Sequence, residues 1–293
     1  MLDIIKSIFF GIVEGITEWL PISSTGHMIL ADEFLFLNTS NAFKDMFLVV
    51  IQLGAILAVV LLYWTKLWPF HLKKTQVKPY FKNENSFFSR LCNNYVHTDR
   101  FILWFKILLA SVPAAILGLV FDDQIDAMLT GNGRAYVVAT ALIVYGVLFI
   151  IIERKQLNTS IEDLDILSYR KALFIGLIQC LALVPGTSRS GSTILGAMLL
   201  GLSRTAAAEF SFFLSIPAMV GGSLIKVLQY FADGNTFSAS ETAILVSGML
   251  SAFIVSVIAI KFLLSYIRKH NFTFFGYYRI ALGIIILIYF LLV

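Results

Sequence analysis

Six apolar segments of about 20 residues each constrain the fold of this chain more than any other feature. The hydrocarbon core of a bilayer is about 30 Å thick, and a helix needs about 20 residues to cross it. Such segments form helices because no lipid-facing backbone group can stay unpaired. The sequence therefore predicts an all-α integral membrane protein with six spans, at Asp45–Trp64, Phe101–Phe121, Ala135–Ile152, Ala206–Tyr230, Thr242–Leu264 and Phe275–Val293.

The composition excludes a soluble domain. Apolar residues make up 58% of the 293 residues and charged residues only 14%, against about 25% charged in a typical soluble protein. The 22 Lys and Arg residues are scattered between apolar runs, so we expect no nucleic-acid partner. Cys92 and Cys180 are far apart and show no metal-binding spacing, which argues against a disulfide framework or a zinc site.

Two further apolar stretches are each interrupted by a proline and a polar loop. Leu2–Leu20 stops at Pro21, and Ala172–Val184 stops before Pro185. The second stretch would form only about 20 Å of helix, which is too short to cross a bilayer. Another short apolar run follows each loop. We therefore expect two re-entrant helix-loop-helix segments, over residues 2–30 and 172–202, whose broken backbone is satisfied by protein or by water.

Lysine and arginine are distributed unevenly between the connections. Thirteen lie after the first, third and fifth spans, seven of them between Lys66 and Arg100, whereas the alternate connections hold only Arg134. Positively charged loops stay on the cytoplasmic side. We therefore expect both termini and the acidic loops to lie outside, which requires each broken segment to enter and leave on one side. The sequence indicates no role for the basic connection 65–100.

A shift of 165 residues superposes the two halves of the chain without a gap in the polar segments. Three spans separate equivalent points, so the repeats, residues 1–155 and 170–293, are predicted to have inverted topology. Inverted repeats with broken helices place a polar site near the midplane of the bilayer. Chance similarity between apolar sequences is the alternative. The matched pairs are Gly11 and Gly176, Glu14 and Gln179, Ser23 and Ser188, and Gly26 and Gly191.

The first polar loop follows two glutamates. Glu14 and Glu18 are four residues apart, so their carboxylates share one helix face. An ionisable group inside a membrane segment costs at least ~2.5 kcal/mol, so we expect a divalent metal, an arginine or a shared proton to compensate. The alternative is an amphipathic surface helix with solvated glutamates. Pro21 ends the helix, and the loop then carries Ser23, Ser24, Thr25 and His27.

The second polar loop places Arg189 between two apolar half-helices. A guanidinium matches phosphate oxygens in two-point contacts, and hydroxyls with free backbone N–H groups would add an anion cradle. A structural ion pair with Glu14 or Glu18 is the alternative, and both can coexist. We expect Glu18 and Arg189 to face one cavity within reach of a diphosphate.

Outside the loops, Gln52 is a polar residue in the middle of the first span. Helix packing and ligand contact explain its position equally well.

At these loops the chain resembles the bacitracin-resistance family of undecaprenyl-diphosphatases, integral membrane lipid phosphatases of bacteria. The resemblance rests on Glu14–His27, Pro185–Thr193, Gly201–Arg204 and Glu209–Phe212 and covers nearly the whole chain. It implies conversion of undecaprenyl diphosphate to the monophosphate carrier of cell-wall synthesis, which confers bacitracin resistance. It also implies a divalent cation, usually Mg²⁺ and alternatively Ca²⁺, and a site in the cytoplasmic membrane that opens to the extracytoplasmic side. A homodimer is left open.

The resemblance also implies roles for individual residues. By motif position, Glu14 and Glu18 would hold the metal or activate the nucleophile, and Arg189 would clamp the diphosphate. Ser24 would be the nucleophile and His27 a proton shuttle, with attack by a metal-bound water and Glu18 as base left open. The phosphate-binding residues would be Ser23, Thr25, Ser188, Arg189, Ser190 and Thr193.

A secondary transporter or lipid flippase is the alternative function, because inverted repeats with broken helices are typical of transporters. Arg189 would then bind an anionic substrate, and the glutamates would carry coupling ions or protons. Phosphate release in detergent, without a membrane gradient, distinguishes the enzyme from the carrier.

Overall fold

The computed structural model describes residues 1–70, 95–130, 133–155 and 157–292. Their regular structure is helical, with two isolated β-bridges. The helices are α1 (Leu2–Thr17), α2 (Ser24–Phe34), α3 (Asn41–Leu62), α4 (Trp64–Leu67), α6 (Thr98–Val120), α7 (Asp122–Thr130), α8 (Arg134–Arg154), η1 (Leu164–Ile166), α9 (Tyr169–Gln179), η2 (Cys180–Leu183), α10 (Arg189–Leu199), α11 (Arg204–Ala232), α12 (Ala239–Ile267) and α13 (Thr273–Leu292). Lys73, Lys74, Lys78, Lys82, Arg90 and Cys92 lie outside the described residues.

Six helices in the described part of the chain are long and apolar enough to cross a membrane, namely α3, α6, α8, α11, α12 and α13. They confirm the six predicted spans and the all-α class. Polar caps extend α11 and α12 beyond the predicted apolar windows, because Ser203 and Ser238 accept hydrogen bonds from backbone N–H groups of the first turn. The first span ends earlier than predicted, because Tyr63 leaves the helical conformation and Trp64 begins the separate helix α4.

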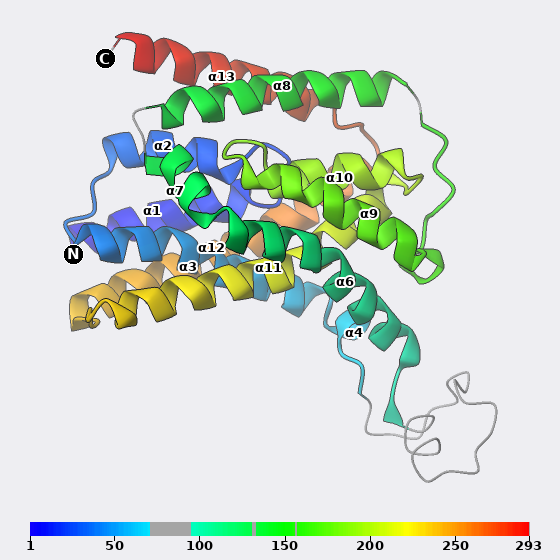
Figure 1. The fold of residues 1–293 in the computed structure, drawn as a ribbon, viewed down its shortest axis with the longest axis horizontal. Helices are drawn as coiled ribbons and strands as arrows, with labels where there is room; N and C mark the ends of the chain where they lie inside the picture. The colour runs from blue at the N-terminus through cyan, green and yellow to red at the C-terminus, as the bar shows by residue number, and fades with distance from the viewer. Residues whose placement is uncertain (71–94, 131–132, 156, 293) are drawn as a thin grey trace.

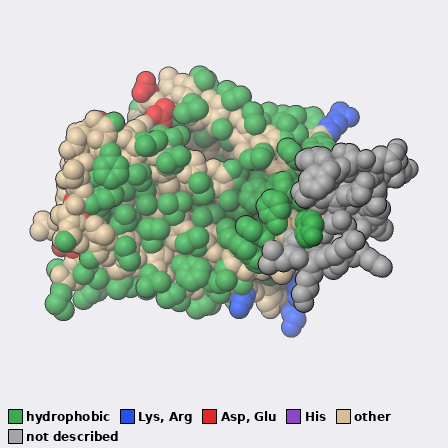
Figure 2. All heavy atoms as spheres, turned by 90° about the horizontal axis from the view of Figure 1, so that it is seen from below, with side chains coloured by type: hydrophobic (Ala, Val, Ile, Leu, Met, Phe, Trp, Pro, Cys, Tyr) green, Lys and Arg blue, Asp and Glu red, His purple; other side chains and the backbone are tan. Residues whose placement is uncertain are grey.

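The helices run broadly along the long axis of the molecule (Figure 1). Both termini lie at one end, together with the connections α6–α8 and α11–α12. The other three connections between spans lie at the opposite end. Seen from below, Asp and Glu side chains lie toward the first end, Lys and Arg toward the other, and an apolar surface lies between them (Figure 2). This belt is the surface that a bilayer would cover.

The two interrupted segments form helix pairs that begin at opposite ends of the molecule. Helix α1 runs from the end with the termini toward the middle, and α2 returns; α9 and α10 do the same from the other end (Figure 1). The polar loops between the paired helices therefore lie in the interior of the bundle. This path is the one that re-entrant segments require, while re-entry itself, the inverted repeat and its boundaries stay predictions.

Each first half-helix packs directly on a span from the other half of the chain. A Cβ atom on Gly11 of α1 would lie 2.0 Å from the Ser251 Oγ and 2.3 Å from the Gly248 carbonyl oxygen of α12. A Cβ on Gly176 of α9 would lie 2.0 Å from the Ala110 carbonyl oxygen of α6. Small residues allow this backbone approach between membrane helices. The long spans thereby fix where the two polar loops begin.

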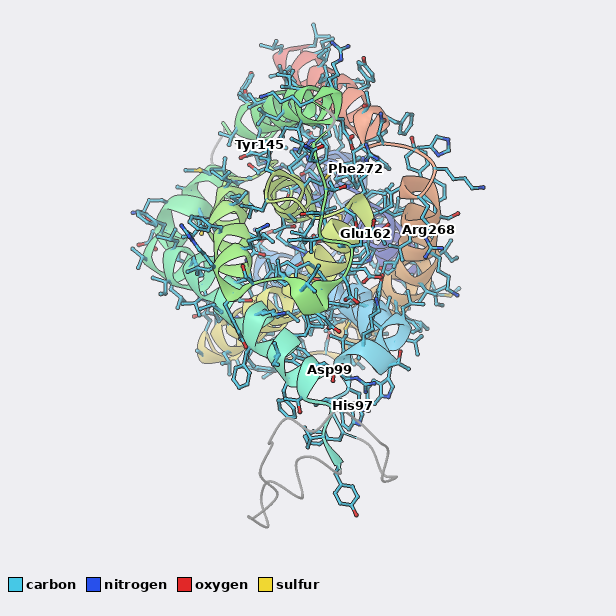
Figure 3. The ribbon with its side chains drawn as sticks, turned by 90° about the vertical axis from the view of Figure 1, so that its right-hand side faces the viewer. His97, Asp99, Tyr145, Glu162, Arg268 and Phe272 are labelled. Atoms are coloured by element: carbon cyan, nitrogen blue, oxygen red, sulfur yellow. The ribbon has the colours of Figure 1, made fainter. Side chains whose placement is uncertain are left out.

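An ion pair joins the elements at the end opposite to the termini. The Arg204 guanidinium at the start of α11 donates to both carboxylate oxygens of Glu153 at the end of α8, at 3.0 and 2.6 Å. Glu153 is buried and also accepts a hydrogen bond of 2.9 Å from the backbone N–H of Phe272. Figure 3 looks onto this end, with Phe272 labelled in the connection between α12 and α13. The Glu153 carboxylate thus joins α8, α11 and that connection.

Candidate functional site

Both polar loops turn into their second helix through a serine with left-handed backbone geometry. Ser23 has φ 72° and Ser188 has φ 71°, and they are the two residues other than glycine with positive φ in the described part of the chain. They are the N-caps of α2 and α10, which start at Ser24 and Arg189. Positive φ is unfavourable for a residue with a Cβ atom and is found where the surroundings enforce it. The two loops therefore share one local design.

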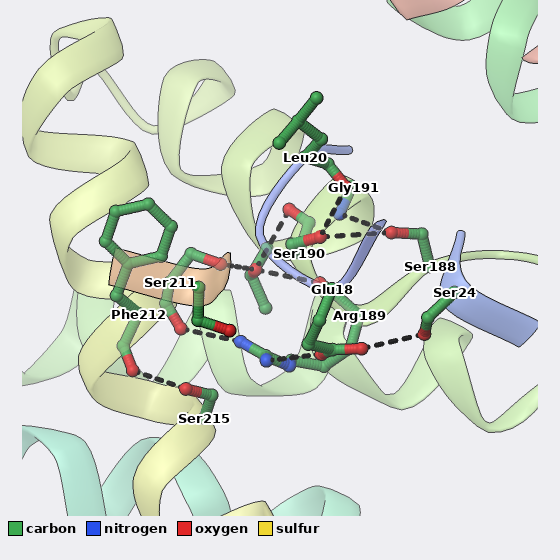
Figure 4. A network of polar contacts seen from close by, with 12 residues as sticks. Glu18, Leu20, Ser24, Ser188, Arg189, Ser190, Gly191, Ser211, Phe212 and Ser215 are labelled. Atoms are coloured by element: carbon green, nitrogen blue, oxygen red, sulfur yellow. Dashed lines mark hydrogen bonds and ion pairs between the residues drawn. The ribbon is translucent and has the colours of Figure 1, made fainter. Parts of the chain in front are cut away.

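Glu18 joins the two loops. Its Oε1 atom lies 2.7 Å from a terminal nitrogen of Arg189, and its Oε2 atom accepts a hydrogen bond of 2.7 Å from the Ser24 hydroxyl (Figure 4). The Glu18 and Arg189 side chains are 8% and 14% exposed. A charged pair this sheltered has a stronger electrostatic effect on a ligand than a solvated one. The structural ion pair weighed from the sequence is thus present, and it lies beside the predicted nucleophile.

Helix α11 holds the Arg189 guanidinium from a second side. Arg189 donates a hydrogen bond of 2.8 Å to the Ser211 carbonyl oxygen (Figure 4). The Thr193 hydroxyl lies 2.6 Å from the Ser211 hydroxyl and donates to the Arg189 carbonyl oxygen at 2.8 Å. The guanidinium carbon also lies 6.0 Å from the centre of the buried Trp19 ring. These contacts fix the orientation of the arginine before any ligand binds.

A cavity of about 190 Å³ lies against this ion pair. The first loop contributes residues to its wall, as do the second loop, η2, α3 and α11. The N-termini of α2 and α10 are at this wall, and helix N-termini favour anions. The cavity is therefore suited to a small anionic group. It is lined by Glu18, Ser24, Thr25, Gln52, Ala182, Gly186, Ser188, Arg189, Ala218 and Met219.

Several predicted site residues support the cavity without lining it. Ser190 is buried, and its hydroxyl lies 3.1 Å from the Ser188 hydroxyl and 3.4 Å from the Leu20 carbonyl oxygen. Thr193 is buried in the contact with α11 described above. The Ser23 hydroxyl is buried without a hydrogen-bond partner. The structure therefore places Thr25 and Ser188 at the cavity, and Ser23, Ser190 and Thr193 behind it.

His27 is engaged on both ring nitrogens and does not line the cavity. Its Nδ1 atom lies 2.8 Å from the Ser23 carbonyl oxygen, and its Nε2 atom lies 2.7 Å from the Tyr278 hydroxyl. The two rings are stacked, with an interplanar angle of 7°. Donation from Nδ1–H to the carbonyl leaves Nε2 as acceptor for the tyrosine hydroxyl. His27 thus connects the first loop to α13, and its role as proton shuttle stays a prediction.

Arg279 of α13 was not predicted from the sequence, although it binds both loops. It is fully buried and donates to the carbonyl oxygens of Pro21 at 3.3 Å, Gly186 at 3.0 Å and Thr187 at 2.8 Å. No salt bridge satisfies it among the described residues, and the Tyr145 ring lies 5.7 Å from the guanidinium carbon. A lone charge inside a span is the sequence signal that could have identified it.

The donor set for a metal is small. No group of three or more His, Cys, Asp or Glu side chains suited to a metal occurs in the described ranges. Glu14 lies one helical turn before Glu18 and is buried, and its Oε1 atom has no hydrogen-bond partner. Mg²⁺ is commonly held by one or two carboxylates together with water and substrate phosphates. An orphaned carboxylate oxygen beside Glu18 therefore fits such a cation.

Fold and site together define a multi-pass helical membrane protein with a buried, arginine-containing anion site between two polar loops. The family model for the bacitracin resistance protein BacA matches residues 7–285. Proteins named undecaprenyl-diphosphatase from Enterococcus faecalis and Lactococcus lactis subsp. cremoris are each 53% identical, over 98% of this chain and 97% of theirs. One from Acetivibrio thermocellus is 53% identical over the full length of both chains. The chain belongs to the BacA family.

Proposed function

We propose that this protein hydrolyses undecaprenyl diphosphate to undecaprenyl phosphate and inorganic phosphate, and so recycles the lipid carrier and supports bacitracin resistance. The observation that carries the proposal is Glu18, which contacts the Ser24 hydroxyl of one loop and the Arg189 guanidinium of the other at 2.7 Å beside one cavity. A nucleophile, a base and an anion clamp are the groups that cleavage of a phosphoanhydride requires. The names of the 53% identical relatives support the same reaction.

Ser24 is the proposed nucleophile. Its hydroxyl donates to Glu18, so the carboxylate can take the proton as Oγ attacks the terminal phosphorus. The bond to the bridging oxygen breaks, and the polyprenyl phosphate leaves. Water then attacks the phosphoserine, regenerates Ser24 and releases inorganic phosphate. Arg189 and the helix N-termini stabilise the negative charge on the transferring group. Direct attack by water with Glu18 as base is the competing route.

Glu14 and Glu18 would hold the divalent cation. Such an ion, Mg²⁺ or Ca²⁺, neutralises charge on the phosphate oxygens when it is bound. Arg189 and the cation would neutralise different charges on the substrate. Removing either one alone is therefore expected to weaken diphosphate binding.

The proposed location is the bacterial cytoplasmic membrane, with both termini and the site on the extracytoplasmic side. The charge distribution supports this orientation, because Lys and Arg side chains gather toward the end opposite to the termini (Figure 2), where Arg268 also lies (Figure 3). The apolar part of the substrate would reach the site from the bilayer. A homodimer stays a prediction.

The test is phosphate release by the purified protein in detergent, with farnesyl or undecaprenyl diphosphate and Mg²⁺. Release is expected in the wild type, and Arg189→Lys, which keeps the charge, is expected to be at least about 10-fold slower because the two-point contact is lost. Diphosphate binding without release would indicate a carrier instead.

Ser24→Ala separates the two routes of attack. We expect it to lower turnover at least about 1000-fold, to a residual rate that can still be measured, and to prevent labelling of the protein by substrate carrying a ³²P terminal phosphate. Turnover within about 10-fold of wild type in Ser24→Ala would assign the attack to water.

A further inference from the structure

Outside the two polar loops, Gln52 is the one polar side chain among the described residues that lines the cavity beside Glu18 and Arg189. Gln52 lies near the middle of the span α3, and the other wall residues from η2 and α11 are Ala182, Ala218 and Met219. The cavity therefore has hydroxyls and charges on the side of the loops, and an apolar wall broken by a single amide.

The Gln52 amide is half-buried and forms no hydrogen bond to another residue in the part of the chain that the structure describes. It lies in the middle of a span, where lipid offers no hydrogen-bonding group. Polar residues in membrane helices normally bond across a helix interface. The sequence alone explained Gln52 equally well by helix packing and by ligand contact, and the structure gives it no contact of the first kind. Because Gln52 lies at the cavity wall, its hydrogen-bond partner is a molecule bound in the cavity.

The chemistry of the amide selects the type of contact. Its nitrogen offers two N–H donors, and a diphosphate is rich in acceptor oxygens. Arg189 and the helix N-termini reach the same cavity from the loops. We propose that Gln52 is a substrate-binding residue, which donates hydrogen bonds from α3 to phosphate oxygens of the diphosphate. The proposal rests on the proposed function, and it adds a third structural element to the anion site.

Two variants at this position test the direction of the hydrogen bond. Gln52→Met keeps the length of the side chain but removes both donors, and Gln52→Glu replaces the donors with an anionic acceptor. A hydrogen bond to a charged group accounts for about 10- to 100-fold in rate or binding. We expect kcat/KM for farnesyl diphosphate to fall by this factor in Gln52→Met and further in Gln52→Glu, because the carboxylate repels the phosphates.

Gln229→Met is the matched control, since Gln229 lies on the exposed surface near the end of α11. It is expected to stay within about twofold of wild type. Thermal unfolding in detergent checks that all variants fold. A Gln52→Met enzyme within twofold of wild type, or a Gln52→Glu enzyme as active as Gln52→Met, overturns the proposal.

A binding measurement makes the proposal independent of turnover. In a Cys92→Ser, Cys180→Ser background, Gln52→Cys is expected to react with a small methanethiosulfonate reagent, and inorganic diphosphate is expected to slow the reaction at least about 10-fold. No reaction, or no protection, contradicts the assignment. If the wild type releases no phosphate but diphosphate still protects residue 52, the proposed function fails while the binding role of Gln52 holds.

Discussion

Replacing Arg279 with methionine tests how the two polar loops are held at their positions. The change removes hydrogen bonds of 2.8, 3.0 and 3.3 Å to Thr187, Gly186 and Pro21. Bonds from a charged donor contribute about 1.5–3 kcal/mol each, and the longest contributes least, so the loss is about 3–6 kcal/mol. Methionine leaves the three carbonyl oxygens without this donor, so nothing in the variant offsets the loss. The free energy of unfolding should therefore fall by about 3–6 kcal/mol.

Activity should also fall at temperatures where the variant is still folded. A displacement of a reacting group by about 1 Å costs about 100-fold in rate. We expect kcat of Arg279→Met, measured below its lowered unfolding temperature, to fall by about that factor. Arg279→Lys should be intermediate, because a single ammonium cannot reproduce the planar set of donors. A methionine variant with kcat within threefold of wild type would refute this account of the loops.

Two further predictions concern packing away from the cavity. Gly11→Ala should destabilise the protein by about 1–3 kcal/mol through overpacking. Gly222→Ala is the control and should not destabilise it, because a Cβ there would meet nothing within 4 Å. Equal unfolding temperatures for the two variants would contradict the described contact between α1 and α12. Glu153→Gln should lower the free energy of unfolding by about 3 kcal/mol, because it breaks the ion pair with Arg204. The variant should leave KM unchanged. A raised KM at temperatures where the variant is folded would place Glu153 in the site instead.

The spans and their number could be predicted from the sequence because the bilayer imposes length and apolarity on each segment independently. Helix ends were less predictable, since they depend on local hydrogen bonds. Ser238, for example, is the N-cap of α12 and forms a capping box with Glu241. Both polar residues lie outside the apolar segment that predicts this span.

The polar loops were recognisable because charged and hydroxyl side chains rarely interrupt apolar helices without a reason. That Glu18 reaches Arg189 followed from the need to compensate a buried carboxylate, although the sequence offered a metal and a shared proton as equal alternatives. The distance between Glu18 and Arg189 depends on how the long spans position α1 and α10, which sequence patterns do not report.

Arg279 is recognisable in the sequence as a lone charge inside a span, but neither its partners nor those of Tyr278 could be assigned, because both residues act from a different helix. Arg279 binds backbone carbonyl oxygens, which carry no side-chain signature in the sequence. Ser211 presents the same difficulty, since its carbonyl oxygen receives the Arg189 guanidinium. Contacts of this kind are visible only when the fold places the partners together.

The most direct test of the central claim, that both loops act on one diphosphate, is a double-mutant cycle in kcat/KM between Ser24→Ala and Arg189→Lys. If the two residues serve one reaction through Glu18, the double variant should be little slower than Ser24→Ala alone, with a coupling of at least about 1 kcal/mol. If the free-energy change of the double variant instead equals the sum of the two single changes to within about 0.5 kcal/mol, the loops act independently, which would contradict the account.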